Sequence, residues 1–272
     1  MLKKLLIGII ISVFAIGFLA YKINLNEFYN IKDRISYIYL IPFAFGGFAG
    51  WALFGIRWYI FLEKKIVFKH ALASVILGGG ANMVLPARGG DILRLYYCKS
   101  ESQIQYPTLL SKVFIEKVID FIAVILIGLV SFLLLGINNA GAGNFAIFTF
   151  SGFLIFSIIT GLVLIRYKNH LVIQLLSIPF KIIKKELFFN TKIKEHIIEL
   201  GEFLTVKTFL KPVIITTIMW LIPYSLAYFG ISGLLGIEIT YIEILFLMFC
   251  GAMGVAVPSA PSGIGVFHAS II

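Results

Sequence analysis

Charged residues are scarce in this chain of 272 residues. They make up 13% of the sequence, while apolar types make up 60% and the mean hydropathy is +1.01. A soluble domain carries about 25% charged residues, so this balance excludes an ordinary water-soluble protein. It also excludes a disordered chain, which needs the opposite composition. The remaining class is a membrane protein with several spans, and at about 20 residues per span the length has room for about six or seven helices.

Several chemical signatures are also missing. The two cysteines, Cys98 and Cys250, provide neither a disulfide framework nor the spacing of a zinc site, so we expect no metal and no cofactor. No Gly-x-x-x-x-Gly-Lys-Ser/Thr occurs, so ATP-driven pumping is not expected. The Asp-x-Asp motif of many metal-dependent glycosyltransferases is absent as well. Gly141-x-Gly143-x-x-Ala146 resembles half of a dinucleotide fingerprint, but it lacks the preceding strand and the acidic residue that such a site needs.

The basic residues are clustered rather than spread. Residues 1–34 hold five Lys/Arg against two Asp/Glu, residues 57–120 nine against five, and residues 166–211 nine against four. Residues 236–272 hold no Lys or Arg and two glutamates. Because Lys and Arg gather in cytoplasmic loops, this pattern indicates topology, with the N-terminus on the cytoplasmic side of the cell membrane. A nucleic-acid-binding surface also gives a high pI, but these clusters lie between apolar runs, so we expect no nucleic acid.

Apolar runs predict an all-α fold: a polytopic membrane helix bundle forming one domain over residues 1–272. The five predicted full spans are 5–21, 37–62, 107–135, 145–165 and 212–235, and residues 244–257 lead back inside. The first run could be a signal peptide, but Phe18-Leu19-Ala20 lacks the small residue required at the first position, which favours a retained anchor. Apolar and charged residues alternate with helical spacing in 166–211, which predicts one or two basic amphipathic helices on the cytoplasmic membrane surface.

Two segments rich in glycine and proline interrupt this pattern, so we expect five full spans plus two broken or re-entrant segments. The first, residues 71–86, has basic flanks on both sides and is expected to enter and return; a full crossing by a weak helix is the alternative. The second covers residues 257–268. The interrupting residues are Gly78, Gly79, Gly80, Asn82, Pro86, Pro258, Pro261, Gly263 and Gly265. Irregular backbone at membrane depth needs surrounding protein or a cavity, and broken segments in both halves point to a substrate site between them. Helix kinks used only for packing are the alternative.

Charged residues follow the first broken segment. Arg88, Asp91 and Arg94 lie within seven residues. Asp91 can pair with one arginine, which leaves the other for an anion, and the planar guanidinium suits phosphate. Glu116 and Asp120 lie one helical turn apart and share a face. Ionisable groups inside a membrane are expensive and indicate function; the alternative is that all of them are solvated at the headgroup level.

Two further basic residues have open interpretations. Lys112 precedes Glu116 by four residues and can pair with it. Arg57 lies near the end of the second span, where its long side chain can extend to the headgroups. A cavity-facing Arg57 is the alternative.

The sequence resembles a known family in three ordered motifs. Asn82-x-x-Leu85-Pro86-x-Arg88-x-Gly90-Asp91-x-x-Arg94 resembles the first motif of the lysylphosphatidylglycerol synthase transmembrane region, a flippase-like family. Glu116-Lys117-x-x-Asp120 is similar to its second motif, usually Glu-Arg-x-x-Asp. Pro258-x-x-Pro261-x-Gly263-x-Gly265 is similar to its third, although Ser262 replaces a usual glycine and His268 stands near where the family often has glutamate. The resemblance covers about residues 40–268.

The resemblance implies a membrane domain that handles anionic lipids. In the larger aminoacyl-lipid synthases, such a domain moves the modified phospholipid between leaflets, and a separate soluble domain makes the aminoacyl ester. This chain has no stretch long enough for a soluble domain of about 100 residues, so a separate lipid-modifying enzyme is a candidate partner. The chain stops inside an apolar run at Ile272, and the resemblance suggests that a further helix follows.

We therefore expect a membrane protein that binds an anionic phospholipid or lipid-linked group and moves it between leaflets. Arg88 and Arg94 would bind the phosphate. The remaining cavity and motif residues would be Asn82, Pro86, Gly90, Asp91, Glu116, Lys117, Asp120, Pro258, Pro261, Gly263, Gly265 and His268. Related archaeal proteins are linked to sugar transfer on polyprenyl lipids, so a membrane-embedded transferase with Glu116 or Asp120 as base is one alternative. A non-catalytic partner of a lipid enzyme is the other.

Overall fold

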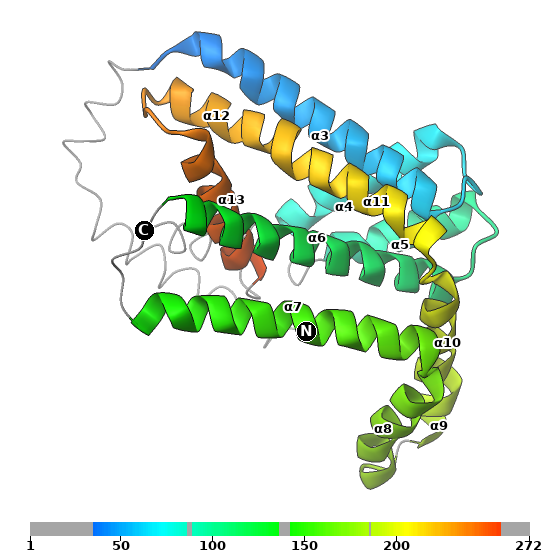
Figure 1. Ribbon diagram of the computed structural model, residues 1–272. Coiled ribbons are helices and arrows are strands. Elements are labelled where there is room, and N and C mark those ends of the chain that lie inside the picture. Colours follow the sequence, from blue (N-terminus) through cyan, green and yellow to red (C-terminus); the bar gives the residue numbers. More distant parts are fainter. Residues whose placement is uncertain (1–34, 86–88, 136–141, 185, 257–272) are drawn as a thin grey trace.

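A computed structural model describes residues 35–85, 89–135, 142–184 and 186–256 (Figure 1). Within these ranges all regular structure is helical, which confirms the predicted all-α class. The elements are η2 (Tyr37–Tyr39), α3 (Leu40–Phe61), α4 (Phe68–Val84), α5 (Gly89–Glu101), α6 (Tyr106–Leu134), α7 (Ala142–Tyr167), α8 (Asn169–Ile182), α9 (Glu186–Phe188), the π-helical turn η4 (Phe189–Ile193), α10 (Lys194–Phe203), α11 (Val206–Met219), the π-helical turn η5 (Trp220–Tyr224), α12 (Ser225–Leu234) and α13 (Tyr241–Ala256).

Three helical segments are long and apolar enough to cross a membrane: Tyr37–Phe61, Tyr106–Leu134 and Phe209–Leu234. They correspond to three of the five predicted spans. A fourth is present if α7 and α8, which meet at 110°, form one bent span. The predicted span 5–21 and the broken segment 257–268 lie outside the described residues. The part of the chain that is described therefore supports a multi-pass membrane bundle with three or four of the predicted crossings.

The longest helices lie side by side (Figure 1). The continuous segment from α11 through η5 to α12 runs along α3, while α6 lies beneath them and α7 lies beyond α6. The short helix α13 packs against α6 and α12, α4 packs on α3, and α5 packs on α4 and α6. Long side chains at the C-terminal end of α3 thereby reach residues of α5 and α6, and the candidate site forms there.

Small residues allow α3 and α12 to approach closely. Without a hydrophobic force between helices in lipid, close backbone contact supplies much of the association. A Cβ atom at Gly46 would lie 2.5 Å from the Pro223 carbonyl oxygen and 2.7 Å from the Ala227 nitrogen. Gly230 likewise faces the backbone of Phe43. These glycines are needed for space rather than for an unusual backbone conformation.

The structure corrects the expected break at the three consecutive glycines. The helix α4 continues through Gly78, Gly79 and Gly80 to Val84, and α5 begins again at Gly89. Each glycine costs about 1 kcal/mol of helix propensity relative to alanine, but two of them make room for neighbours: Gly78 lies against Arg94 and Gly79 against Trp51. Propensity predicted a break, and tertiary packing overrode it.

Helices α4 and α5 nevertheless pack on each other as a hairpin, and entry and return of residues 71–86 within the membrane stays a prediction. Gly90 lies against the carbonyl oxygen of Gly78, with no room for a Cβ atom. The N–H of Gly90 donates to Asn82 Oδ1 at 2.8 Å. The side of the membrane that this hairpin faces stays a prediction.

The basic segment 166–211 forms more than surface helices. Helix α8 has no buried residue and extends away from the bundle (Figure 1). Helix α10, in contrast, packs on α6 and α7 and buries Ile197 and Leu200. Gly201 permits this contact, because a Cβ atom there would lie 2.7 Å from the Ile165 carbonyl oxygen. The amphipathic pattern predicts helices that face the membrane surface. In α10, however, the apolar side packs on α6 and α7.

Neighbouring glycines of α3 give a matched test of the close packing. We expect Gly46→Ala to destabilise the protein by about 1–3 kcal/mol, because the added methyl meets fixed backbone atoms. Gly47→Ala is the control, since nothing lies within 4 Å of its Cβ position. Thermal unfolding in detergent measures both variants. Equal unfolding temperatures for the two would contradict the close contact of α3 and α12.

Candidate functional site

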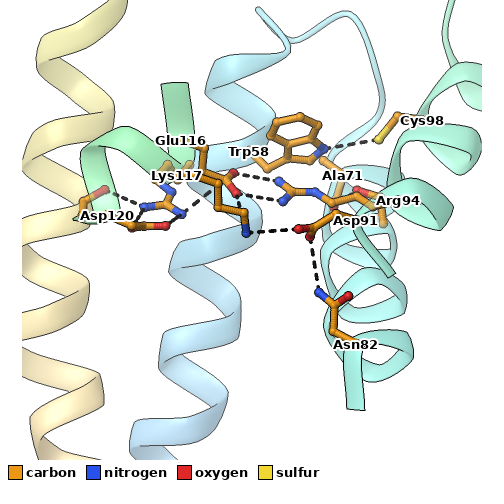
Figure 2. Close-up of polar contacts among 12 residues, drawn as sticks. Trp58, Ala71, Asn82, Asp91, Arg94, Cys98, Glu116, Lys117 and Asp120 are labelled. Carbon is orange, nitrogen blue, oxygen red and sulfur yellow. Dashed lines mark hydrogen bonds and ion pairs between the residues drawn. The ribbon is translucent and has the colours of Figure 1, made fainter. Parts of the chain in front are cut away.

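Helices α3, α5 and α6 bring six charged side chains together at one level of the bundle (Figure 2). The cations are Arg57, Arg94 and Lys117, and the carboxylates are Asp91, Glu116 and Asp120. We call these six residues the ion network. Its formal charges sum to zero. Charge balance is what makes such a group tolerable in a low-dielectric interior, because an unpaired buried charge carries a desolvation penalty of several kcal/mol.

Glu116 is the centre of the network and is 0% exposed. Its two carboxylate oxygens accept one hydrogen bond each from Nη1 and Nη2 of Arg94, both at 2.8 Å (Figure 2). Nη2 of Arg57 lies 3.8 Å from the same carboxylate. One carboxylate of α6 therefore attracts a guanidinium from α3 and another from α5, which joins these three helices.

Arg57 faces the interior and does not extend to the headgroups. It is 1% exposed. Its Nη1 and Nη2 donate to both carboxylate oxygens of Asp120, with the Nη2 bond at 3.0 Å. Nη1 also donates to Oγ1 of Thr216 on α11 at 2.6 Å. The snorkelling interpretation is therefore wrong, because partners on α6 and α11 replace the water that a headgroup position would supply.

Aromatic rings cover the two guanidinium groups. The guanidinium carbon of Arg94 lies 3.7 Å from the centre of the Trp58 ring and 4.9 Å from the centre of the Phe54 ring. The guanidinium carbon of Arg57 lies 5.0 Å from the centre of the same Phe54 ring. Trp58 in turn donates from Nε1 to Cys98 Sγ at 3.3 Å. Arginine stacks on aromatic faces with an attraction of about 0.5–2 kcal/mol, so these rings fix the orientation of both guanidinium groups.

Phe54 and Trp58 were not predicted as parts of the site. For Phe54 the sequence holds a signal, because Phe54 and Arg57 stand at positions i and i+3 and share one face of a helix. For Trp58 the local sequence holds none, because its ring covers Arg94, which comes from α5.

The other end of the network is more open. Lys117 is 37% exposed, and its Nζ lies 3.7 Å from Asp91 Oδ2 and 4.0 Å from Glu116 Oε1. Asn82 donates from Nδ2 to Asp91 Oδ1 at 3.3 Å (Figure 2). These distances are longer than those of Arg94 to Glu116. Lys117 is therefore the cation of the network that a ligand can reach.

A cavity of about 600 Å³ opens beside the network. Lys117 and Asp120 of α6 lie in its wall, together with Trp220 and Tyr224 of the π-helical turn η5. The rest of the lining is largely apolar and comes from α6, α7, α12 and α13. π-Helical turns occur frequently at functional sites, and a mostly apolar cavity with a few convergent polar groups is the usual form of a ligand site.

The structure brings together seven of the predicted site residues: Asn82, Gly90, Asp91, Arg94, Glu116, Lys117 and Asp120. The other predicted residues lie outside the described ranges: Pro86, Arg88, Pro258, Pro261, Gly263, Gly265 and His268. In the described part of the chain, no cluster of His, Cys, Asp and Glu could hold a metal ion.

Two expected pairings can be compared with the described residues. Asp91 contacts Lys117 and Asn82 and not Arg94, because Glu116 takes both terminal nitrogens of Arg94; Arg88, the other arginine that could pair with Asp91, lies outside the described ranges. Lys112 does not pair with Glu116 four residues away. Its Nζ donates to Glu63 Oε1 at 2.7 Å, at the end of α3. The hydrogen bonds from Lys112 and Lys65 lower the pKa of Glu63.

The central carboxylate can be tested by an isosteric change. We expect Glu116→Gln to destabilise the protein by about 3–5 kcal/mol, because it leaves two buried guanidinium groups with one carboxylate fewer. Thermal unfolding in detergent measures the loss. Glu238→Gln is the control, since Glu238 is exposed in the loop before α13. An unchanged unfolding temperature for Glu116→Gln would contradict a structural role for the network.

Comparisons with known proteins agree with the motifs. A family model described as "Lysylphosphatidylglycerol synthase TM region" matches residues 5–272. Glycosyltransferase AglD of Haloferax volcanii is 25% identical over 137 residues, which are 49% of this chain and 22% of that protein. The matched part thus spans about a fifth of the length of this relative. No solved structure matches the chain.

Proposed function

The chain belongs to the lysylphosphatidylglycerol synthase transmembrane-region family, and on this basis we propose that it binds an anionic phospholipid or lipid-linked group and moves it between the leaflets. Its family and its candidate membrane-spanning helices support a membrane protein of lipid metabolism or transport, without naming the lipid or the reaction. The specific function rests on the cavity beside the ion network.

The contact of that cavity with Lys117 is the observation that supports this function most directly. The cavity offers an apolar wall for acyl chains and, at one place, a partly exposed ammonium group for a phosphate. Its volume of about 600 Å³ lies within the range of known small-molecule sites, and it can accommodate a lipid headgroup. Asp120, also in the wall, gives the site a second charge of opposite sign.

The arginines take a different part in this proposal from Lys117. Both terminal nitrogens of Arg94 are hydrogen-bonded to Glu116, so Arg94 binds a phosphate only when that pair opens. The described network is neutral, and an added phosphate brings a negative charge that needs a further cation. Arg88, in the first family motif, is the residue that we propose for this role.

Movement of a lipid requires two conformations that the lipid stabilises differently. Lys117 on α6 and Asp91 on α5 are linked by a long ion pair, 3.7 Å from nitrogen to oxygen. A phosphate that binds Lys117 competes with Asp91 and weakens this link. The α4–α5 hairpin is then free to shift relative to α6. We propose this exchange of partners as the step that couples binding to movement.

A liposome assay tests the function. The purified chain is placed in vesicles with fluorescent phosphatidylglycerol or phosphatidylcholine, and a membrane-impermeant quencher bleaches the outer leaflet. We expect more than half of the phosphatidylglycerol signal to be lost, because lipid from the inner leaflet reaches the quencher. Lys117→Gln and Arg88→Gln should slow this excess loss by about tenfold, the effect of about 1.4 kcal/mol.

Lys99→Gln is the matched control. Lys99 lies on α5 and is not among the residues that line the cavity, and its Nζ is hydrogen-bonded to Gln105. Excess quenching that persists in both Lys117→Gln and Arg88→Gln would support translocation but contradict the proposed binding site. Absence of excess quenching in the unchanged protein would reject translocation.

Group transfer to a lipid is the second candidate function, because the relative that matches part of the chain is a glycosyltransferase. In this case Asp120, which lies in the cavity wall, would act as the base. Incubation with labelled nucleotide sugars and polyprenyl phosphate distinguishes the two functions. Labelled lipid formed by the unchanged protein but not by Asp120→Asn would favour the transferase.

A further inference from the structure

A second cavity, of about 410 Å³, lies between α6, α7 and α11. Its lining is mostly aliphatic, with residues such as Ile122 and Leu126 of α6, Leu162 of α7 and Val213 of α11. None of its lining residues belongs to the lining of the cavity beside the ion network. It is therefore a separate site, and we call it the lateral groove.

The lateral groove reaches one charged side chain, Arg166 in the last turn of α7. Its Nη1 donates to the carbonyl oxygen of Gly201 at 3.0 Å. This bond exists because Gly201, which has no side chain, lets α10 approach α7 closely. Helix α10 thus holds one guanidinium nitrogen at the groove, while Arg166 as a residue stays exposed.

Arg166 differs from the arginines of the ion network in its partners. Arg57 and Arg94 each face a carboxylate, whereas Arg166 has no ion pair with an Asp or Glu of the described ranges and uses a neutral carbonyl instead. Tyr167, whose ring centre lies 5.9 Å from the guanidinium, and the exposed Lys168 follow it in sequence. An exposed cation beside tyrosine is typical of the membrane–water interface.

The groove and the cation together match one kind of ligand. An aliphatic groove suits an acyl chain, which it binds by van der Waals packing because the chain comes from a bilayer that is equally apolar. A guanidinium without a carboxylate partner suits a phosphate, to which it donates parallel hydrogen bonds. Basic clusters also favour the leaflet that is rich in anionic lipids. The ligand that satisfies both features is an anionic phospholipid.

We propose that the lateral groove binds one anionic phospholipid of the surrounding bilayer, with an acyl chain between α6, α7 and α11 and its phosphate on Arg166. This lipid is not the transported one, and its binding does not depend on translocation. It connects the end of α7 to two other helices at the point where α7 and α8 meet at 110°. Its role is therefore to stabilise the bend between these helices.

Lipid titrations of the purified protein in detergent test this site. Native mass spectrometry counts the phosphatidylglycerol or phosphatidylcholine molecules that stay bound, and thermal unfolding follows the same titration. The titration uses Lys117→Gln as background, because the cavity beside the ion network is proposed to bind the same lipid. In this background we expect one tightly bound phosphatidylglycerol and a higher unfolding temperature with phosphatidylglycerol than with phosphatidylcholine. Arg166→Gln should weaken the apparent affinity for phosphatidylglycerol by about tenfold, the usual effect of losing a charge-assisted hydrogen bond.

Three further variants locate the lipid. Ala123→Phe should also remove the bound phosphatidylglycerol, because its ring fills the groove while Arg166 stays in place. Lys168→Gln, which removes a neighbouring charge outside the groove lining, and Lys117→Gln, which changes the other cavity, should both keep the tightly bound lipid. Equal binding of the two lipids would overturn the proposal, as would retention of phosphatidylglycerol when Arg166→Gln is combined with Lys117→Gln, or its loss in Lys117→Gln alone.

Discussion

The contact of Glu116 with two arginines is the interaction on which the rest of the site depends. Its carboxylate is completely buried, binds Arg94 of α5 through both oxygens and lies close to Arg57 of α3. Geometry of this kind, two parallel charge-assisted hydrogen bonds, is what compensates a buried charge for the loss of water. The positions of α3, α5 and α6 are thereby fixed relative to one another, and the short hairpin α4–α5 is held against the long helices.

The cavity follows from this arrangement. Asp120 lies one turn after Glu116 on α6 and binds Arg57, so its carboxylate lies in the cavity wall together with Lys117. The wall also contains residues of the π-helical turn η5, and the ring of its Tyr224 occupies the space that a side chain at Gly50 would need. A wide turn within a spanning helix and a glycine on its neighbour therefore shape the same space. Tyr224, which packs η5 against α3, therefore also lines the cavity that a ligand would enter.

The sequence was sufficient for the fold class, because 60% apolar residues in long runs leave few alternatives to a helix bundle. The motif residues from Asn82 to Asp120 were found because charges are rare and conspicuous in apolar surroundings. Pairing could not be predicted. Whether Asp91 or Glu116 receives Arg94 depends on how α5 is rotated against α6, and helical spacing within one segment carries no information on that. The predicted helix break at the glycines of α4 was wrong for the same reason, because their neighbours Trp51 and Arg94 come from other helices.

The separation of Arg57 from its partners has a consequence for biosynthesis. Arg57 precedes Asp120 by 63 residues and Thr216 by 159 residues. At about 5–20 residues per second, the ribosome makes Asp120 on the order of 3–13 s after Arg57. During this interval α3 carries an arginine without its carboxylate partner. Arg57 lies four residues before the end of α3, where its long side chain can extend to the headgroups. The burial of Arg57 in the folded protein therefore follows the synthesis of α6, so that this side chain changes its environment after α3 itself has been made.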